Sequence, residues 1–589
     1  MMRSGVKTNL MSAFAPICSE KRSAVAVVGG GMAGIWTAYQ LAKTGIETTL
    51  VTYQREDRGG LQGASRRSAG AFNLGPLTTE GFSTYLRDLG LGQTHPSVAR
   101  PLLEHLATAQ EELAALMDLK PIKLGVALAS GNGEQFLERM YRKFRELGGE
   151  IIDGWVTRLA VDAVSCQGLQ YESPQGIGKL RARALVLASG GYAGLFRNSI
   201  RTNCFGNVLG SYLKCGGIAT NLEFLFKHGY GNVDANALTP TEELPGAEIY
   251  DTRHERVTWL EQLLFYRQGT RTHLQAVQFW LRNPETEFYV DLAYRPLYLK
   301  LWTLNALLEK TEGFSASAEA EEAQAVTDIV ELFPPEARAA VGGKIAEVAR
   351  SRTSIGYFTF EELKQLFKPA EQSKFRVRPL TYFSMGGIAH ADFATNLKET
   401  YVAGEAMHDF GANRVGGLPW SLYLTSAYSI CAQISASLEN GWEDGEDFDL
   451  DPRPSRFDGE LLETIQRRMY ESQEKELTAA KAMACIDWLR ETRLALEEDE
   501  TVLHDGVSWL LVAEAILECS LCRKESRGFF FRFDFQEQDA KLNDSLSCAW
   551  YDQRTDKVSA RLLPWEQVAQ RLKESVSEHA TLNNGAVTA

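Results

Sequence analysis

The sequence has no long hydrophobic run and no excess of basic residues. None of its apolar runs approaches the ~20 residues that a membrane-spanning helix needs. The segment before Ser23 holds only a short, broken apolar stretch, which is not typical of a secretory signal. The formal net charge of -14 disfavours nucleic acid and anionic membranes as partners, but it is compatible with a local basic pocket for an acidic substrate. We therefore expect a cytoplasmic protein with no direct membrane insertion and no nucleic-acid partner.

Cysteine is also sparse, because the 589 residues include only nine, scattered along the chain and odd in number. This usage favours reduced thiols over a disulfide framework. No haem-attachment or iron-sulfur spacing occurs, so a metal-borne electron carrier would belong to another chain. The close pair Cys519 and Cys522 lies in a segment with a helical pattern and has no second pair or histidine after it. That context favours packing thiols over a metal or redox site, and we expect no bound metal.

The most informative stretch that is present runs from Ser23 to Tyr53, in a chain whose 44% hydrophobic content suits several globular domains. The apolar run 24–28 predicts a buried parallel strand, and the following glycines turn the chain into a helix with one apolar face. A second strand is expected at 47–52. The glycines follow the spacing of a dinucleotide fingerprint, in which they allow a tight turn, close approach of a pyrophosphate and close packing of helix on strand. They are Gly29, Gly31 and Gly34.

Thr52 stands at the end of the second predicted strand, where an acidic residue usually binds the ribose hydroxyls. A threonine hydroxyl can also bond a ribose, so the site is retained. The change argues against a simple NAD dehydrogenase.

The glycine- and serine-rich segment 59–75, GGLQGASRRSAGAFNLG, carries the first specific family resemblance. It is similar to the Ser-x-x-Ala-x-Gly-Gly segment of the fumarate reductase, succinate dehydrogenase and L-aspartate oxidase flavoproteins. The resemblance implies that Ser65 and Gly70 bind FAD. Membrane-bound members carry a histidine that holds FAD covalently just after this serine, whereas Arg66 stands here. We therefore expect noncovalent FAD.

Further motifs extend the resemblance over nearly the whole chain. LVLASGG is similar to the family's LVLATGG, FGNVLG stands where the family has Gly-Asp-Gly, TYVAGE is similar to LFAVGE, and GANRVG is nearly identical to GANRLG. After the last motif the family continues Asn-Ser-Leu-Leu, whereas this chain has Leu418-Pro419-Trp420-Ser421. The resemblance implies a further set of cofactor-binding residues: Ala188, Gly190, Gly191, Asn207, Glu405, Arg414 and Ser421.

The same resemblance implies a set of catalytic residues. Arg414 would clamp a substrate carboxylate beside the flavin, a geometry that suits the planar guanidinium. His228 falls on one substrate-binding histidine of the family, whereas Tyr382, in RPLTYFSMGGIAH, replaces the second. Arg256 falls on the arginine that delivers a proton. Glu242 would line the proton path, but the arginine expected after it is missing.

The expected fold class is α/β, with a Rossmann-like FAD-binding domain, an inserted α+β capping domain and a C-terminal helical domain. We expect the FAD-binding domain at 1–232 and 378–442, the capping domain at 233–377, and the helical domain with its tail at 443–589. Within these parts, apolar periodicity predicts a helical region over 98–147, strands over 151–171, and C-terminal helices over 460–474, 476–496 and 507–524. The tail after Leu572 is polar, and we expect it to be frayed.

The expected function is that of an FAD-dependent oxidoreductase that moves a hydride between flavin N5 and a carboxylate-bearing substrate, interconverting C–C and C=C bonds. One alternative is an amino-acid oxidase or dehydrogenase similar to L-aspartate oxidase. A second is a noncatalytic flavoprotein subunit of an electron-transfer complex. The expected partners are a small carboxylic acid and, in a complex, a separate electron-transfer subunit.

Overall fold

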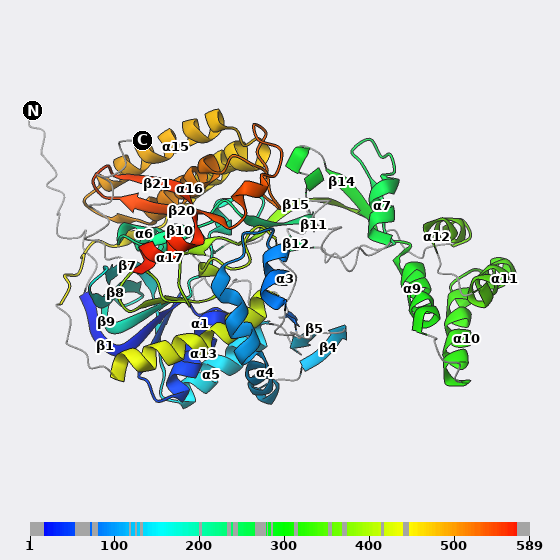
Figure 1. Ribbon diagram of the computed structural model, residues 1–589, viewed down its shortest axis with the longest axis horizontal. Helices are drawn as coiled ribbons and strands as arrows, with labels where there is room; N and C mark the ends of the chain where they lie inside the picture. The colour runs from blue at the N-terminus through cyan, green and yellow to red at the C-terminus, as the bar shows by residue number, and fades with distance from the viewer. Residues whose placement is uncertain are drawn as a thin grey trace, which may run out of the picture. The chain divides into compact units, whose positions relative to one another are not determined.

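The chain forms two compact units in the computed structural model (Figure 1). Unit 1 comprises Met1–Phe226 and Thr381–Ala589, and unit 2 is Lys227–Leu380, inserted between them. The structure describes residues 17–53, 71–73, 81–116, 119–123, 126–129, 133–199, 203–232, 237–238, 246–265, 278–279, 281–283, 287–310, 316–351, 356–367, 374–413, 418–439 and 447–573.

Unit 1 is organised around a seven-stranded sheet with the order β6-β2-β1-β9-β8-β7 and with β17 also paired to β9. The four strands at its centre run parallel. Their apolar residues are buried, as expected of strands covered on both faces. The strands are β1 (Ile17–Val28), β2 (Thr48–Thr52), β6 (Glu150–Asp153), β7 (Trp155–Val161), β8 (Cys166–Ser173), β9 (Gly176–Leu187) and β17 (Thr400–Val402).

Helices cover this sheet, and Figure 1 shows α1, α4, α5 and α13 gathered below it in that view. Helix α1 packs against both α5 and α13, and α13 packs against α4. Helix α1 (Met32–Lys43) is buried along most of its length, including Ile35, Trp36 and Leu41. The other helices are α4 (Ala99–Leu116), α5 (Gly133–Glu146) and α13 (Leu418–Glu439).

The C-terminal part of unit 1 forms a second layer, at the top of Figure 1. Helices α15 (Ala479–Glu497) and α16 (Asp505–Cys522) pack together, with α14 (Gly459–Met469) against α16. The hairpin of β20 (Ser545–Asp552) and β21 (Lys557–Pro564) joins β10 (Ile218–Thr220) and β16 (Gly387–Ile388) in a four-stranded sheet. Helix α6 (Asn207–Lys214) packs on α16, and α17 (Trp565–Lys573) packs on the hairpin.

Unit 2 has two cores of its own. One belongs to a five-stranded sheet, which is ordered β12-β11-β15-β14-β13 and carries α7 (Thr258–Phe265). The other lies among four helices and includes Leu304, Ile329 and Ile345. The strands are β11 (Leu225–Asn232), β12 (Ala237–Leu238), β13 (Glu248–Tyr250), β14 (Phe288–Asp291) and β15 (Lys374–Ser384). The helices are α9 (Arg295–Lys310), α10 (Ala316–Glu331), α11 (Pro335–Ser351) and α12 (Tyr357–Lys364).

The expected α/β class is confirmed, and one prediction of local structure is wrong. The region 98–147 is not helical throughout, because β4 (Leu119–Lys123) and β5 (Val126–Ala129) pair with each other and β5 pairs with β3 (Ala71–Asn73). The C-terminal region contains the predicted helices, and the β20–β21 hairpin accompanies them. The domain boundaries proposed from the sequence stay a prediction, and the expected fraying after Leu572 falls mainly on residues beyond 573, outside the described part.

No helix in the described part of the chain is both long and apolar enough to cross a membrane.

Candidate functional site

The parallel strands of unit 1 end together at one edge of the sheet. Val28 of β1 pairs with Val51 of β2 and with Leu187 of β9, and Leu187 pairs with Val402 of β17. The residues that follow these ends are therefore neighbours, although they are far apart in sequence. Ligands of open parallel sheets bind at such carboxyl edges.

The fingerprint turn at this edge is closed too tightly to admit side chains at two of its glycines. Gly29 has a φ of +106°, and a Cβ there would lie 2.3 Å from the carbonyl oxygen of Ala188. A Cβ on Gly34 would lie 1.8 Å from the carbonyl oxygen of Gly29. Close packing of α1 on β1 and β9 therefore requires glycine at both positions.

Thr52 and Tyr141 hold the middle of the turn in place. The Tyr141 hydroxyl, from α5, donates to the carbonyl oxygen of Gly30 at 2.6 Å. A Cβ on Gly30 would lie 2.4 Å from Thr52 Oγ1 and 2.5 Å from the Tyr141 hydroxyl. Thr52 is 8% exposed, so its hydroxyl packs against the turn. The sequence pattern did not indicate Tyr141, because its contact with Gly30 spans 111 residues.

The N-terminus of α1 is open to an anion. Its N-cap is Gly31, which is exposed and has no side chain to cap the helix, and the first turn contains no acidic residue. The first backbone N–H groups of a helix lack intrahelical partners and carry the positive end of its dipole. This end of α1 therefore has the chemistry of a pyrophosphate site.

Glu405, which follows β17 after Ala403 and Gly404, is held by a second turn at the same edge. Its Oε1 accepts hydrogen bonds from the backbone N–H of Ser384 at 3.0 Å and from the Ser384 hydroxyl at 3.3 Å. A Cβ on Gly191 would lie 1.8 Å from Ser384 Oγ and 2.8 Å from Glu405 Oε1. Among the described residues Glu405 Oε2 has no hydrogen-bond partner, so it is free to accept from a ligand hydroxyl.

These residues fit an extended dinucleotide. The helix N-terminus can bind phosphates, Thr52 lies at the end of the strand next to it, and Glu405 offers a carboxylate oxygen beside Gly191. At Gly29, Gly34 and Gly191 a Cβ would overlap neighbouring atoms, so only glycine fits at these positions. The described edge thus has the donors, acceptors and close backbone that FAD requires.

The remaining predicted cofactor residues are less uniform. Asn207, the first residue of α6, accepts a hydrogen bond from the indole N–H of Trp509 at 2.9 Å, so its amide oxygen is already used inside the protein. Ser421 is fully buried in the first turn of α13. Ser65, Gly70 and Arg414 lie outside the described residues.

The predicted catalytic residues divide between the units. Tyr382 belongs to unit 1, whereas His228, Glu242 and Arg256 belong to the sequence of unit 2. His228 lies on β11, a strand whose side chains are described only in part and not at that residue, and Glu242 is outside the described residues.

Tyr382 lies in a cluster of aromatic rings in unit 1. Its ring centroid is 4.4 Å from that of Phe383 and 6.3 Å from that of Phe226, and Phe226 in turn lies 4.8 Å from both Phe383 and Phe529. Tyr382 and Phe383 are on β15, the strand that ends at Ser384, whose side chain takes part in the Gly191–Glu405 contact. The ring neighbours of Tyr382 among the described residues are therefore phenylalanines.

Arg256 is held by carboxylates within unit 2. Its guanidinium forms ion pairs with Glu261 and with Glu361, the latter at 3.0 Å, and approaches Glu248 at 3.6 Å. Burial lowers the pKa of Arg256, but the hydrogen bonds to Glu261 and Glu361 raise it more, so the pKa lies above its ordinary value. Proton release from Arg256 in this arrangement is harder than from a free arginine.

The sequence did not indicate a stack of three histidines in unit 1. The rings of His95 and His390 stack at 3.8 Å, and His408 lies edge-on at 5.3 Å from His95. Backbone N–H groups of Ser97 and Phe393 donate to Nδ1 of His95 and His390, so each Nε2–H donates onward to a carbonyl oxygen. Burial lowers the pKa of all three, to about 4 for His390 and about 3 for His408.

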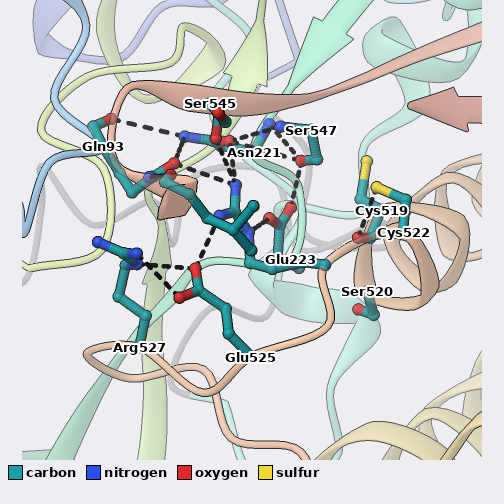
Figure 2. Close-up of polar contacts among 12 residues, drawn as sticks. Gln93, Asn221, Glu223, Cys519, Ser520, Cys522, Glu525, Arg527, Ser545 and Ser547 are labelled. Atoms are coloured by element: carbon teal, nitrogen blue, oxygen red, sulfur yellow. Dashed lines mark hydrogen bonds and ion pairs between the residues drawn. The ribbon is translucent and has the colours of Figure 1, made fainter. Parts of the chain in front are cut away.

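Cys519 and Cys522, the close pair noted in the sequence, lie at the end of α16 (Figure 2). The Cys522 thiol donates to the carbonyl oxygen of Cys519 at 3.2 Å. Burial raises the pKa of Cys522 to about 12 and that of Cys519 well above its ordinary value. No cluster of three or more metal-binding side chains occurs within the described ranges.

Comparisons with known proteins agree with this geometry. Residues 24–116 match a family model described as FAD dependent oxidoreductase, and residues 505–577 match one described as fumarate reductase flavoprotein C-term. The chain is 21% identical over 540 residues to an L-aspartate oxidase of Pyrococcus abyssi, a match that covers 87% of this chain and 95% of the relative.

Solved structures show the same fold at low identity. An E. coli quinol fumarate reductase FrdA chain has a TM-score of 0.64 at 15% identity, covering 95% of this chain and 98% of that one. Mycobacterium smegmatis Sdh1 has a TM-score of 0.63 at 18% identity, covering 93% and 94%. Adenylylsulfate reductase from Archaeoglobus fulgidus has a TM-score of 0.62 at 14% identity, covering 93% and 96%.

The cradle at the sheet edge and the matching family models define the chain as an FAD-dependent oxidoreductase. Its C-terminal segment, its overall sequence and its fold are similar to those of fumarate reductase, L-aspartate oxidase and succinate dehydrogenase flavoproteins.

Proposed function

We propose that the protein binds FAD noncovalently and oxidises or reduces a carboxylic acid at a C–C bond next to the carboxylate. The observation that carries this proposal is the convergence of Gly29, Gly191 and Glu405 at one edge of the sheet, in the unit whose sequence also contains Arg414. Bound FAD supplies hydride acceptance or donation. The remaining steps belong to side chains of this protein.

Arg414 is the residue that we assign to the substrate carboxylate. Its planar guanidinium suits two parallel hydrogen bonds to such a group. The positive charge of the guanidinium, bound to the carboxylate, also polarises the neighbouring carbons. It thereby stabilises the negative charge that develops on them during the reaction. The segment that precedes it in sequence is buried in unit 1, with Ala412 fully buried and Asn413 6% exposed, and this burial supports an interior role for the motif.

Arg256 is the proposed proton donor, and its ion pairs place a condition on that role. Donation of a proton to a carbanion-like carbon requires a guanidinium whose charge is not fully compensated by Glu261 and Glu361. We therefore propose that Arg256 acts only in a state in which at least one of these ion pairs is broken. Glu242 and His228 stay proposals on the resemblance alone.

The substrate that we favour carries one carboxylate and an apolar end. The rings around Tyr382 support this choice, because Phe226, Phe383 and Phe529 offer apolar area. The second candidate is an amino acid, which the match to an L-aspartate oxidase along 87% of this chain supports. The fold itself does not decide, since a protein named adenylylsulfate reductase shares it.

Anaerobic mixing distinguishes these candidates. We expect 3-phenylpropanoate to bleach the oxidised flavin, or cinnamate to reoxidise the reduced flavin, faster than succinate or fumarate. Faster bleaching by L-aspartate favours the second candidate. A bound flavin that responds to none of these acids contradicts the proposal and favours a noncatalytic flavoprotein subunit. Flavin that survives acid precipitation attached to the chain contradicts noncovalent binding.

The electron partner and the compartment also stay proposals. We propose a cytoplasmic enzyme that exchanges electrons with a separate subunit, in keeping with the absence of haem and iron-sulfur spacings from its own sequence. Purification from native cells tests this, because a co-purifying iron-sulfur or haem protein supports the proposal. A lone chain that reduces oxygen to peroxide at full rate contradicts it.

A further inference from the structure

The segment Arg523–Gly528, which follows α16, links three distant parts of unit 1. It contacts the loop around Gln93, the turn at Asn221 and Glu223, and the backbone at Ala412. Ala412 stands two residues before Arg414 in the sequence. The described residues therefore connect a buried charge network to the segment that leads into the proposed carboxylate site.

The network consists of two arginines and two glutamates that are all fully buried. Arg523 pairs with Glu223 at 2.5 Å and with Glu525 at 3.0 Å, and Arg527 pairs with Glu525 at 2.8 Å. Figure 2 shows Gln93, from one loop, and Asn221 and Glu223, from one turn, gathered around the same point, with Glu525 beside Arg527. The four charges cancel. The side-chain nitrogen and oxygen atoms of these four residues all have hydrogen-bond or ion-pair partners in the protein. A buried ion network without such partners would be destabilising.

The side chain of Gln93 bonds to this network, and its backbone lies against Gly411. Arg523 Nη2 donates to Gln93 Oε1 at 3.0 Å, and Gln93 Nε2 donates to the carbonyl oxygen of Leu542 at 2.9 Å. A Cβ on Gly411, whose φ is +77°, would lie 2.3 Å from the backbone carbonyl of Gln93. The Gln93 loop thus forms one wall against the backbone at Gly411.

Gly528 forms the opposite wall. A Cβ on Gly528 would lie 2.1 Å from the carbonyl oxygen of Ala412, well inside an ordinary contact of about 3.3 Å. The Ala412 N–H donates to the carbonyl oxygen of Gly90 at 3.2 Å, which ties the same residue to the Gln93 loop. The backbone of Ala412 is therefore enclosed from both sides by groups that the charge network holds.

We infer that Arg523, Glu525 and Gly528 are positioning residues, which set the backbone of Gly411–Asn413 and thereby the place from which Arg414 reaches its substrate. The inference rests on the proposed function of Arg414 in binding a carboxylate. The physical reason is rigidity: a guanidinium fork fixes direction as well as distance, and an error of about 1 Å in a substrate-positioning group can cost about 100-fold in rate. Asn413 Oδ1 is buried and has no partner among the described residues, so the end of this segment still has one acceptor to offer.

The first test is Gly528→Ala, which forces the carbonyl of Ala412 to move by about 1 Å. We expect the dissociation constants of cinnamate, fumarate and L-aspartate, read from the perturbation of the flavin spectrum, to rise at least 10-fold for whichever of them the wild type binds. Bound FAD per chain should stay unchanged. The matched control is Gly148→Ala in the same unit, because Gly148 also has a positive φ but a Cβ there meets nothing within 4 Å. Equal affinities in Gly528→Ala and wild type overturn the inference.

A double-mutant cycle separates positioning from general damage. If Gly528 acts through Arg414, Gly528→Ala should weaken acid binding in the wild type and have no further effect in an Arg414→Gln background. An undiminished effect in that background overturns the inference. Should Gly528→Ala fail to fold, Arg523→Lys serves instead, because it keeps the positive charge beside Glu223 and Glu525 but loses the planar fork.

If the wild type binds none of these acids, the proposed function is wrong. Crystal structures of wild type and Gly528→Ala test the positioning role in that case as well. Displacement of residues 411–414, with α1 and the fingerprint turn unmoved, supports the positioning role. An unmoved Arg414 guanidinium overturns it whatever the substrate proves to be.

Discussion

At the scale of single residues, Gly34 offers the sharpest test of the cofactor site. A Cβ there would lie 1.8 Å from the carbonyl oxygen of Gly29, so Gly34→Ala must separate α1 from the turn that would cradle the pyrophosphate. We expect the variant to retain less than about a tenth of the bound flavin per chain, measured by absorbance after gel filtration. Gly459→Ala should keep full flavin content, and full content in Gly34→Ala would contradict the assigned cradle.

Arg256→Gln tests the proposed proton donor. We expect turnover to be abolished while FAD stays bound, since every predicted cofactor residue belongs to unit 1 and Arg256 belongs to unit 2. The control is Arg253→Gln in the same loop, whose side chain is 73% exposed and pairs with Asp251 and Glu255. Wild-type rates in Arg256→Gln would remove the residue from the mechanism.

The same substitution carries a stability effect that the control lacks. Without Arg256, the Glu261 carboxylate, which is only 2% exposed, loses its cation. Because the arginine itself is about one-third exposed, we expect a loss of roughly 1–2 kcal/mol in the free energy of unfolding, between the values for surface and buried pairs. Urea denaturation of both variants measures it, and equal midpoints would show that the carboxylate cluster contributes little.

Single residues also show what the sequence could and could not predict. The roles of Gly29 and Gly34 were predictable, because strand, turn and helix follow one another locally. The bond from Trp509 to Asn207 spans 302 residues and has no local pattern. Tyr382 could be located by its motif, but its ring neighbours could not, since Phe226 and Phe529 arrive from other parts of the chain.

At the scale of elements, three connections of unit 1 meet in the histidine stack. His95 follows α3 (Phe82–Leu89), His390 follows β16, and His408 follows the short helix at Gly404–Ala406. Around them stand Trp565 and the buried Arg523, whose charge further lowers the pKa of His408. All three imidazoles are fully buried and satisfied in their neutral form, so protonation would disrupt the packing of these connections.

This stack predicts acid sensitivity. The pKa values in the folded state lie below the ordinary value of about 6.5, so the stabilisation is complete above pH ~6.5 and is lost as pH falls toward the folded values. Each histidine removes about 1.4 kcal/mol per pH unit in that window, or about 4 kcal/mol per unit for three. Urea denaturation between pH 7 and pH 5 measures the slope.

His390→Asn is the variant that assigns this slope. An asparagine Oδ1 can accept from the Phe393 N–H as Nδ1 of His390 does, but the amide does not titrate. We expect the loss of stability per pH unit to shrink by about one-third. His504→Asn, which removes a histidine bonded to Asp499 at the N-cap of α16, is the comparison. An unchanged slope in His390→Asn would mean that other groups govern the acid response.

Elements were predictable where their pattern is local and long. Strands β6 to β9 and helices α14 to α16 follow the expected periodicity. The pattern predicts helix for β4 and β5, because short apolar runs suit either structure and because β5 pairs with β3, which lies far away in the sequence.

At the scale of the whole molecule, unit 2 is an insertion whose two ends meet. Phe226 closes the first part of unit 1 and Thr381 opens the second, and the Phe226 ring lies 4.8 Å from that of Phe383. The class of fold was predictable from the fingerprint and the motifs around it. The substrate was not, since it depends on side chains that these two parts of the chain bring together.

Excision of unit 2 tests the division of labour. Replacement of Lys227–Leu380 by a short Gly-Ser linker should leave a protein that binds FAD, because the cradle residues lie in unit 1, but that has no turnover. Flavin content and circular dichroism measure the first result. A soluble, folded product without flavin would show that unit 2 contributes to the cofactor site.

The adjacency of Phe226 and Phe383 also bears on how such proteins diversify. Because the inserted segment begins and ends at neighbouring positions, it can be replaced as one continuous piece of sequence during evolution. Such a replacement does not change the strand order of the seven-stranded sheet in unit 1. Unit 2 and unit 1 can then evolve at different rates. The contact between the Phe226 and Phe383 rings at the boundary constrains both.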